Sequence, residues 1–252
     1  LAGQACEMSE LKILSKKYKF KIIEDASHAI GGKYKNSKIG SCKYSDITVF
    51  SFHPVKIITS AEGGAALTNN KKFADRMRQL REHGIEKNKN RFVGRYHGPW
   101  FYQQKSLGYN YRLSDIHSAL GLNQLKKVDE FVKKRNLIFN YYKKKLKNLP
   151  IYFQEEKKYI LSSKHLVIVL VPKKDHLNLF RFLRKKNIFV NLHYIPIYLH
   201  PYYKKQKFKT SSFKNSNLYY SRALSLPVYF KLSKKNQDYV INLVIKFFKK
   251  KK

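Results

Sequence analysis

The sequence has few acidic residues: 16 Asp and Glu stand against 53 Lys and Arg, a formal net charge of +37 over 252 residues. It has only two cysteines, Cys6 and Cys42, too few for a disulfide framework or a cysteine-based metal cluster. No apolar run reaches the ~20 residues that a membrane helix needs, and the first residues lack the basic start and apolar centre of a signal peptide. We therefore expect a cytoplasmic protein without a metal site or a membrane partner.

The charge by itself indicates a protein that binds nucleic acid or an anionic membrane. No helix-turn-helix, zinc finger or RNA-binding aromatic motif accompanies it. The excess is mostly Lys and occurs together with many Asn, Ile, Phe and Tyr, residues whose codons are rich in A and T. We interpret most of the charge as a base-composition bias on solvated faces and expect no nucleic-acid partner. A basic nucleic-acid-binding protein is kept as the alternative.

Helical and strand patterns alternate in the first part of the chain, which is typical of a sheet covered by helices. With 43% hydrophobic residues, the chain can bury a core. The patterns predict helices over 7–18, 71–82 and from 115 towards 146, strands over 19–24, 46–51 and 64–68, and a structureless Gly-, Asn- and aromatic-rich loop over 84–108.

Pro150 is the expected domain boundary. After it, the patterns predict strands over 164–171 and 188–193, a helix over 175–186 and a last amphipathic helix from 232. The sequence thus predicts an α/β protein with a large domain over 1–150 and a small α+β domain over 151–252.

Two charged residues stand out by position. Asp25 ends an apolar strand, where ligands bind in open α/β sheets. Lys56 follows the next strand, ahead of a Gly63-Gly64 pair that permits close backbone approach. A Lys amine that forms a Schiff base and a carboxylate that keeps a pyridine nitrogen protonated suit pyridoxal phosphate, and Ser51 could bind its phosphate. From spacing alone, solvated loop charges are the alternative.

Five segments then give the sequence a family resemblance. They are EDASHA at 24–29, SFHPVK at 51–56, EGGA at 62–65, LREHG at 80–84 and GYNYRL at 108–113. In this order they resemble the DegT/DnrJ/EryC1/StrS family of pyridoxal-phosphate-dependent sugar aminotransferases. The resemblance covers nearly the whole chain and implies the aspartate aminotransferase fold, type I.

Within that family, residues 1–8 and 193–198 are most similar to the pseudaminic acid branch. Its members transfer an amino group from glutamate to C4 of a UDP-linked 4-keto-6-deoxy-hexosamine. The resemblance therefore implies an enzyme with a nucleotide-sugar substrate, glutamate as amino donor, and a homodimer with a shared active site. A homologue that binds the cofactor without turnover is a further alternative.

The resemblance also implies roles for individual residues. Lys56 would carry the cofactor and shuttle the proton, and Asp25 would pair with the pyridinium nitrogen; a surface lysine and a strand-end cap are the alternatives. His28 would hydrogen-bond the cofactor's 3′ oxygen, and Ser51 would bind the cofactor's phosphate. Asn110 would bind the phosphate of the cofactor held by the neighbouring subunit. An ordinary half-buried histidine and a turn asparagine are the alternatives for His28 and Asn110.

His193 and Tyr194 would contact the sugar nucleotide, and edge packing is the alternative. The resemblance assigns no mechanistic step to Arg81, His83 or Arg112, and His53 is left without a role.

The chain is short for this family and starts at Leu1, after the point where the family's phosphate-cradling turn and first strands would stand. We therefore expect an N-terminally incomplete sequence or a truncated gene product. Alone, such a chain is expected to bind pyridoxal phosphate poorly and to be inactive.

Overall fold

The structure is a computed structural model that describes residues 1–205 and 212–249. It contains two compact units: the N-terminal unit, Ala5–Val128, and the C-terminal unit, which joins Leu1–Gln4 to residues 129–252. The division lies earlier than the expected boundary at Pro150, because α4 (Val128–Lys145) packs its buried face into the core of the C-terminal unit.

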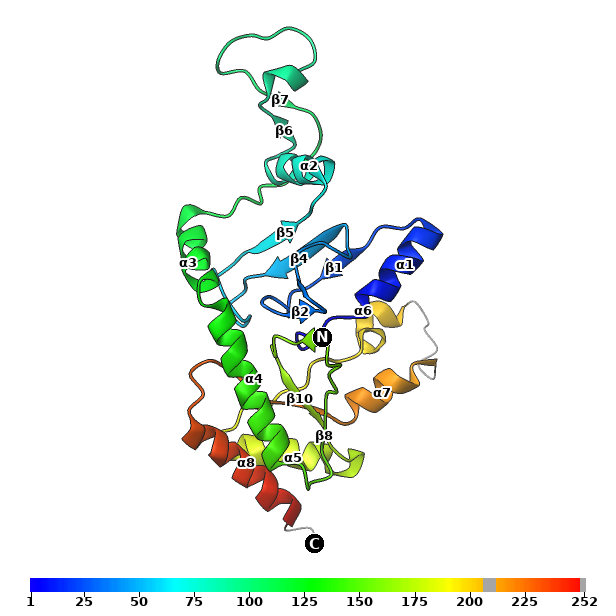
Figure 1. Cartoon of the computed structure of the whole chain (residues 1–252), viewed down its shortest axis with the longest axis vertical. Helices are drawn as coiled ribbons and strands as arrows, with labels where there is room; N and C mark the ends of the chain where they lie inside the picture. The colour runs from blue at the N-terminus through cyan, green and yellow to red at the C-terminus, as the bar shows by residue number, and fades with distance from the viewer. Residues whose placement is uncertain (206–211, 250–252) are drawn as a thin grey trace. The chain divides into compact units, whose positions relative to one another are not determined.

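The N-terminal unit is built on a three-stranded sheet in the order β1-β4-β5 (Figure 1). β1 (Ile23–Asp25) runs parallel to β4 (Ile47–Ser51), and β4 pairs antiparallel with β5 (Gly64–Leu67). The unit's other elements are α1 (Met8–Tyr18), β2 (Lys33–Tyr34), β3 (Ser37–Lys38), α2 (Lys71–Arg81), β6 (Ile85–Glu86), η1 (Lys89–Arg91), β7 (Gln103–Gln104) and α3 (Asp115–Leu125).

The register of this sheet decides which side chains share an edge. Asp25 lies opposite Val49, and the amide of Ala26 still donates to the Val49 carbonyl at 2.9 Å. Because β1 and β4 are parallel, their carboxyl ends lie at the same edge, so Asp25 and the loop after Ser51 meet there. β1 starts later than predicted, because Lys19 ends α1 in a left-handed conformation with φ of 56°.

The stretch expected to be structureless forms a hairpin arm, residues 82–110, in which β6 pairs antiparallel with β7 (Figure 1). Two glycines form the neck of this arm. A Cβ at Gly84 would lie 1.8 Å from the Ser106 carbonyl oxygen, and one at Gly108 would lie 2.2 Å from the Gly84 nitrogen. Further out, Gly94 has no atom within 4 Å of such a Cβ. The neck is therefore closed to any side chain, whereas the surroundings of Gly94 are open.

The helix expected from 115 towards 146 is two helices. Ser114 caps the first of them, since its hydroxyl accepts from the His117 amide at 3.3 Å. α3 ends at Leu125, where the backbone tightens: the amide of Lys127 donates to the Gln124 carbonyl at 3.0 Å. α4 buries an apolar face, whereas α3 has no buried residue.

The C-terminal unit has an antiparallel sheet in the order β11-β10-β8. Its elements besides α4 are β8 (Tyr152–Phe153), β9 (Ile160–Leu161), β10 (Val167–Leu170), α5 (Lys173–Lys185), η2 (Ile197–Leu199), α6 (Pro201–Lys204), α7 (Lys214–Tyr220), β11 (Ala223–Leu226) and α8 (Lys234–Lys249). The strand predicted over 188–193 is reduced to a single bridge between Asn191 and Ser225. No helix in the described ranges combines the length and the apolar character needed to cross a membrane.

One continuous core holds the C-terminal unit together. It draws fully buried side chains from α4, β10, α5, β11 and α8, among them Tyr142, Val169, Leu183, Leu224 and Val244. A buried cation crosses it: Nη1 of Arg135 donates to the carbonyls of Lys164, His165 and Val228, each at 3.2 Å. This guanidinium ties α4 to two loops that come from distant parts of the sequence.

Candidate active site

The first candidate residue, Asp25, is held by its own turn. Oδ1 of Asp25 accepts from the Ser27 hydroxyl at 2.5 Å and from the Ser27 amide at 3.1 Å. These two hydrogen bonds are the main reason why the pKa of Asp25 lies below its ordinary value; the nearby His28 and Lys56 lower it further, and burial opposes them. The carboxylate is therefore ionised at neutral pH and can face a cation.

His28 and Lys56 lie close to this carboxylate, since both act on it electrostatically. His28 is half-buried in the turn in which the amide of Ala29 donates to the Ala26 carbonyl at 2.8 Å. Asp25 thus lies within electrostatic range of both His28 and Lys56. Their assignment to cofactor atoms stays a prediction.

Lys56 lies in a loop that closes on itself. The amide of Phe52 donates to the Gly63 carbonyl at 2.8 Å, and the amide of Ser60 donates back to the Phe52 carbonyl at 3.0 Å. Ile57, 5% exposed, and Ile58, 2% exposed, anchor the loop beside the half-buried lysine. The two hydrogen bonds at Phe52 close the loop, and the two buried isoleucines anchor it, so together they restrict where the amine of Lys56 can lie.

Ser51 ends β4 at the start of this loop, opposite Gly64 of β5. Its hydroxyl accepts from the His53 amide at 3.4 Å, and His53 Nδ1 accepts from the Val55 amide at 3.3 Å. His53 therefore has a local structural role in shaping the loop. A Cβ at Gly64 would lie 2.6 Å from the Phe50 carbonyl oxygen, so the close approach expected of the glycine pair is between strands.

Asn110 does not join this edge; it lies where the chain leaves the hairpin arm. It forms a bridge with Glu82, and its Oδ1 accepts from Arg112 at 3.3 Å. Tyr111 donates its amide to the Arg81 carbonyl at 3.0 Å, which fixes the backbone beside Asn110 to the end of α2. The predicted contact of Asn110 with a neighbouring subunit stays a prediction.

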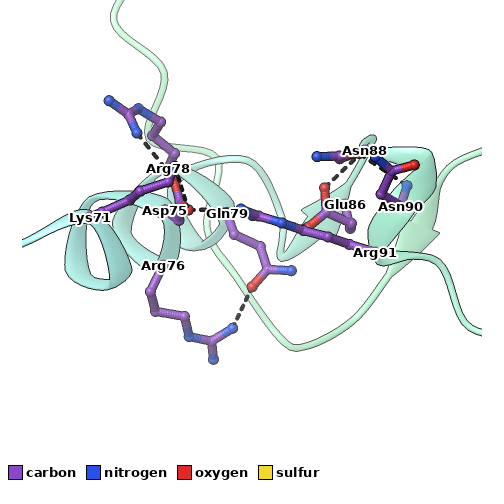
Figure 2. Close-up of polar contacts among 9 residues, drawn as sticks. All are labelled: Lys71, Asp75, Arg76, Arg78, Gln79, Glu86, Asn88, Asn90 and Arg91. Carbon is purple, nitrogen blue, oxygen red and sulfur yellow. Dashed lines mark hydrogen bonds and ion pairs between the residues drawn. The ribbon is translucent and has the colours of Figure 1, made fainter.

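Ion pairs hold the arm against α2, as Figure 2 shows. Asp75 accepts from Arg91 of the arm at 2.9 Å and lies 3.4 Å from both Lys71 and Arg78 of its own helix. Arg91 also reaches Glu86 at 3.6 Å. The pKa of Asp75 is below its ordinary value, chiefly through the hydrogen bond from Arg91.

His193 and Tyr194 lie in the C-terminal unit and contact each other, with ring centroids 4.9 Å apart. Nδ1 of His193 shares a hydrogen bond of 2.8 Å with the hydroxyl of Ser225, and the His193 carbonyl accepts from the Tyr219 hydroxyl at 2.6 Å. Burial lowers the pKa of His193 and raises that of Tyr194. Both side chains are thus uncharged at neutral pH.

Two residues of these clusters are absent from the sequence predictions. Ser27 had a local signal. An Asp side chain commonly accepts a hydrogen bond from the backbone amide two residues later, in an Asx-turn, and Ser27 stands at that position. Ser225 had none, because it lies 32 residues after the histidine that it contacts.

The N-terminal cluster fits pyridoxal phosphate by the chemistry of its groups. Lys56 supplies an amine for the aldehyde, Asp25 an ionised carboxylate for the ring nitrogen, and Ser51 a hydroxyl for the phosphate. A metal centre finds no support in residues 1–205 and 212–249, where no group of three or more His, Cys, Asp or Glu side chains could hold an ion.

Comparison with known proteins decides the family. The model of the DegT/DnrJ/EryC1/StrS aminotransferase family matches residues 1–245. The chain belongs to this family. It is 39% identical over 256 residues to the UDP-4-amino-4,6-dideoxy-N-acetyl-beta-L-altrosamine transaminase of Campylobacter jejuni subsp. jejuni, an alignment that covers 100% of this chain and 65% of that protein.

Solved structures of family members confirm the α/β fold that the resemblance implied. Helicobacter pylori PseC, an aminotransferase involved in the biosynthesis of pseudoaminic acid, matches with a TM-score of 0.87 and 34% identity over 99% of this chain and 65% of its own. The PMP form of the Streptococcus pneumoniae sugar aminotransferase Spr1654 matches with a TM-score of 0.89 and 26% identity, over 99% of this chain and 68% of its own. Among the curated relatives, the chain spans 65% of the Campylobacter jejuni protein named above, less than two thirds of its length.

Proposed function

We propose that this chain belongs to a pyridoxal-phosphate-dependent nucleotide-sugar aminotransferase. The observation that carries the proposal is the cluster at the carboxyl edge of β1 and β4, where Asp25 and Lys56 come together. A carboxylate and an amine at the same sheet edge are the two groups that this cofactor needs from a protein. Family membership over residues 1–245 supports the same assignment.

Each residue of the cluster has a distinct task in the proposal. Lys56 binds the cofactor covalently, and its amine, once released, takes and returns the proton at the reacting carbon. Asp25, ionised and oriented by Ser27, holds the proton on the cofactor's ring nitrogen. His28 and Ser51 bind the 3′ oxygen and the phosphate. When bound, the cofactor supplies the electron sink for both half-reactions.

The proposed reaction moves an amino group from glutamate to C4 of a UDP-linked 4-keto-6-deoxy-hexosamine. It is supported by the similarity to the Campylobacter jejuni transaminase of a UDP-linked amino sugar and to Helicobacter pylori PseC. His193 and Tyr194 would contact the nucleotide sugar. We further propose a cytoplasmic homodimer in which Asn110 reaches the partner's cofactor.

Cofactor attachment tests the proposal directly. Incubation of the chain with pyridoxal phosphate, borohydride trapping and peptide mass analysis should place the label on Lys56. Lys56→Ala should lose the label, whereas Lys16→Ala, on the exposed face of α1, should keep it. Labelling of another lysine with Lys56 left unmodified would refute the assignment.

Product analysis tests the reaction class. A longer protein that contains this chain, supplied with a UDP-linked 4-keto sugar and glutamate, should give a product whose mass corresponds to replacement of the keto oxygen by an amine. The same product from Lys56→Ala at an unchanged rate would end the proposal.

A further inference from the structure

The ring of His193 contacts a buried serine of the neighbouring strand β11, Ser225. β11 alternates its side chains between two faces: Leu224 and Leu226 enter the main core, whereas Ala223 and Ser225 face the other side. Ser225 is 7% exposed, so its hydroxyl belongs to the interior of the unit. Its partner there is the ring of His193.

Two hydrogen bonds fix the histidine from different directions. The 2.8 Å hydrogen bond between the Ser225 hydroxyl and Nδ1 orients the imidazole ring, and the 2.6 Å hydrogen bond from the Tyr219 hydroxyl orients the backbone carbonyl of His193. The backbone is fixed as well, because the amide of Ser225 donates to the Asn191 carbonyl at 2.8 Å, two residues before His193. Backbone and ring are thus both restrained, with Nδ1 engaged by Ser225 and Nε2 left for a further hydrogen bond.

The described partners of His193 are uncharged. They are Ser225 and Tyr194 at the ring and Tyr219 at the carbonyl. Burial raises the pKa of Tyr219 to about 12, so this phenol remains a donor at neutral pH. Burial also keeps the imidazole neutral, and a neutral ring with Nδ1 engaged offers one hydrogen bond through Nε2. In a chain with 53 Lys and Arg, an uncharged cluster of this kind is suited to an uncharged ligand group.

We propose that Ser225 and Tyr219 are positioning residues that hold His193 so that its Nε2 binds a hydroxyl or carbonyl of the sugar, and not the diphosphate. A diphosphate gains most from charged donors, whereas the described contacts of His193 are all neutral and a sugar oxygen is matched by one neutral hydrogen bond. The inference rests on the proposed function, since it assigns a part of the same substrate to His193.

The positioning role can be tested without any turnover. The chain would be labelled with ¹³C,¹⁵N-histidine, and the ring signals of His193 would be assigned by their loss in His193→Gln. Ser225→Ala should move the His193 Nδ1 signal, and Ser225→Thr, which restores a hydroxyl in a residue suited to a strand, should return it. Ser163→Ala is the matched control, because Ser163 is fully buried and its hydroxyl has no hydrogen-bond partner in the described structure. An unmoved Nδ1 signal in Ser225→Ala would overturn the proposal.

Ligand titrations of the same labelled chain test the sugar assignment. UDP-N-acetylglucosamine should shift the Nε2 signal of His193, and UDP alone should not. Ser225→Ala should weaken the affinity for UDP-N-acetylglucosamine about fivefold and leave that for UDP unchanged, as expected for one misplaced hydrogen bond. An equal Nε2 shift with UDP, or binding of the sugar nucleotide with no shift at His193, would refute the inference. If neither ligand binds, the proposed function is contradicted, while the Ser225 variants still decide the positioning role.

Discussion

The two units differ in how they use their apolar side chains. The C-terminal unit buries them in one core, in which Val169 and Leu183 are 1% and 0% exposed. In the N-terminal unit, neither α2 nor α3 has a buried residue, and Ile116 of α3 is 83% exposed. The unit that carries the candidate catalytic residues is therefore the one with less apolar burial. Stability and candidate chemistry can accordingly be changed by separate mutations.

The largest expected effect comes from the C-terminal core. Leu183→Ala should lower the free energy of unfolding by about 2–5 kcal/mol, because it leaves a cavity in a fully buried site. Leu122→Ala, at a position of α3 that is 63% exposed, should change it by less than about 0.5 kcal/mol. Urea unfolding followed by circular dichroism measures both. Equal losses would show that α3 is as well packed as the core and would remove the contrast between the units.

A smaller effect is expected at Arg135. Arg135→Met should cost about 1–3 kcal/mol of unfolding free energy, because three buried carbonyls lose their donor. Burial lowers the pKa of Arg135 to about 10, which shows that the charge itself is held at a cost, so the net loss stays below that of a core cavity. Arg135→Lys serves as control, since it keeps the cation with fewer donors. A more stable Arg135→Met variant would contradict the prediction.

The N-terminal unit should respond to acid through Asp25. A carboxyl group with a lowered pKa stabilises the folded state above its unfolded pKa and loses that contribution as the pH falls through its folded pKa. Asp25→Asn should therefore make the urea midpoint less sensitive to acid below about pH 4. Ser27→Ala should act in the same direction, because Ser27 is the main cause of the lowered pKa. A midpoint whose acid sensitivity is the same in all three proteins would sink this prediction.

The smallest effect is expected at the hairpin arm. Asp75→Asn should leave the urea midpoint unchanged, because exposed ion pairs contribute little to global stability. It should instead speed amide hydrogen exchange at Gln103 and Gln104, since Arg91 loses its contact with α2. Glu10→Gln on α1 is the control and should leave exchange in the arm unchanged. Unchanged exchange in Asp75→Asn would show that the neck alone holds the arm.

Much of the N-terminal sheet could be predicted because its signals are local. An apolar strand that ends in Asp25 needs only its own residues to be recognised. The helix predicted from residue 71 likewise begins after Asn70, a residue type that favours helix N-caps, whose side chain accepts from the Phe73 amide at 3.2 Å. The hairpin arm was missed for the opposite reason: β6 and β7 have two residues each, too few to show alternation.

The site shows the same limit. Asp25 and the loop that carries Lys56 share a sheet edge because two recognisable strands pair in parallel, so this placement could be predicted. The contact between His193 and Ser225 depends on β11, a fully buried strand of only four residues that lies 32 residues beyond the histidine. Contacts set by tertiary packing across such segments leave no mark in the local sequence.

The two-glycine neck of the hairpin arm also limits how this part of the chain can change during evolution or by design. Any side chain at Gly84 would overlap the Ser106 carbonyl, and one at Gly108 would overlap the Gly84 nitrogen, so both positions are closed to substitution. The open surroundings of Gly94 make the far part of the arm the place where insertions or a fused peptide can be accepted. We therefore expect the tip of the arm around Gly94 to tolerate changes that its neck at Gly84 and Gly108 does not.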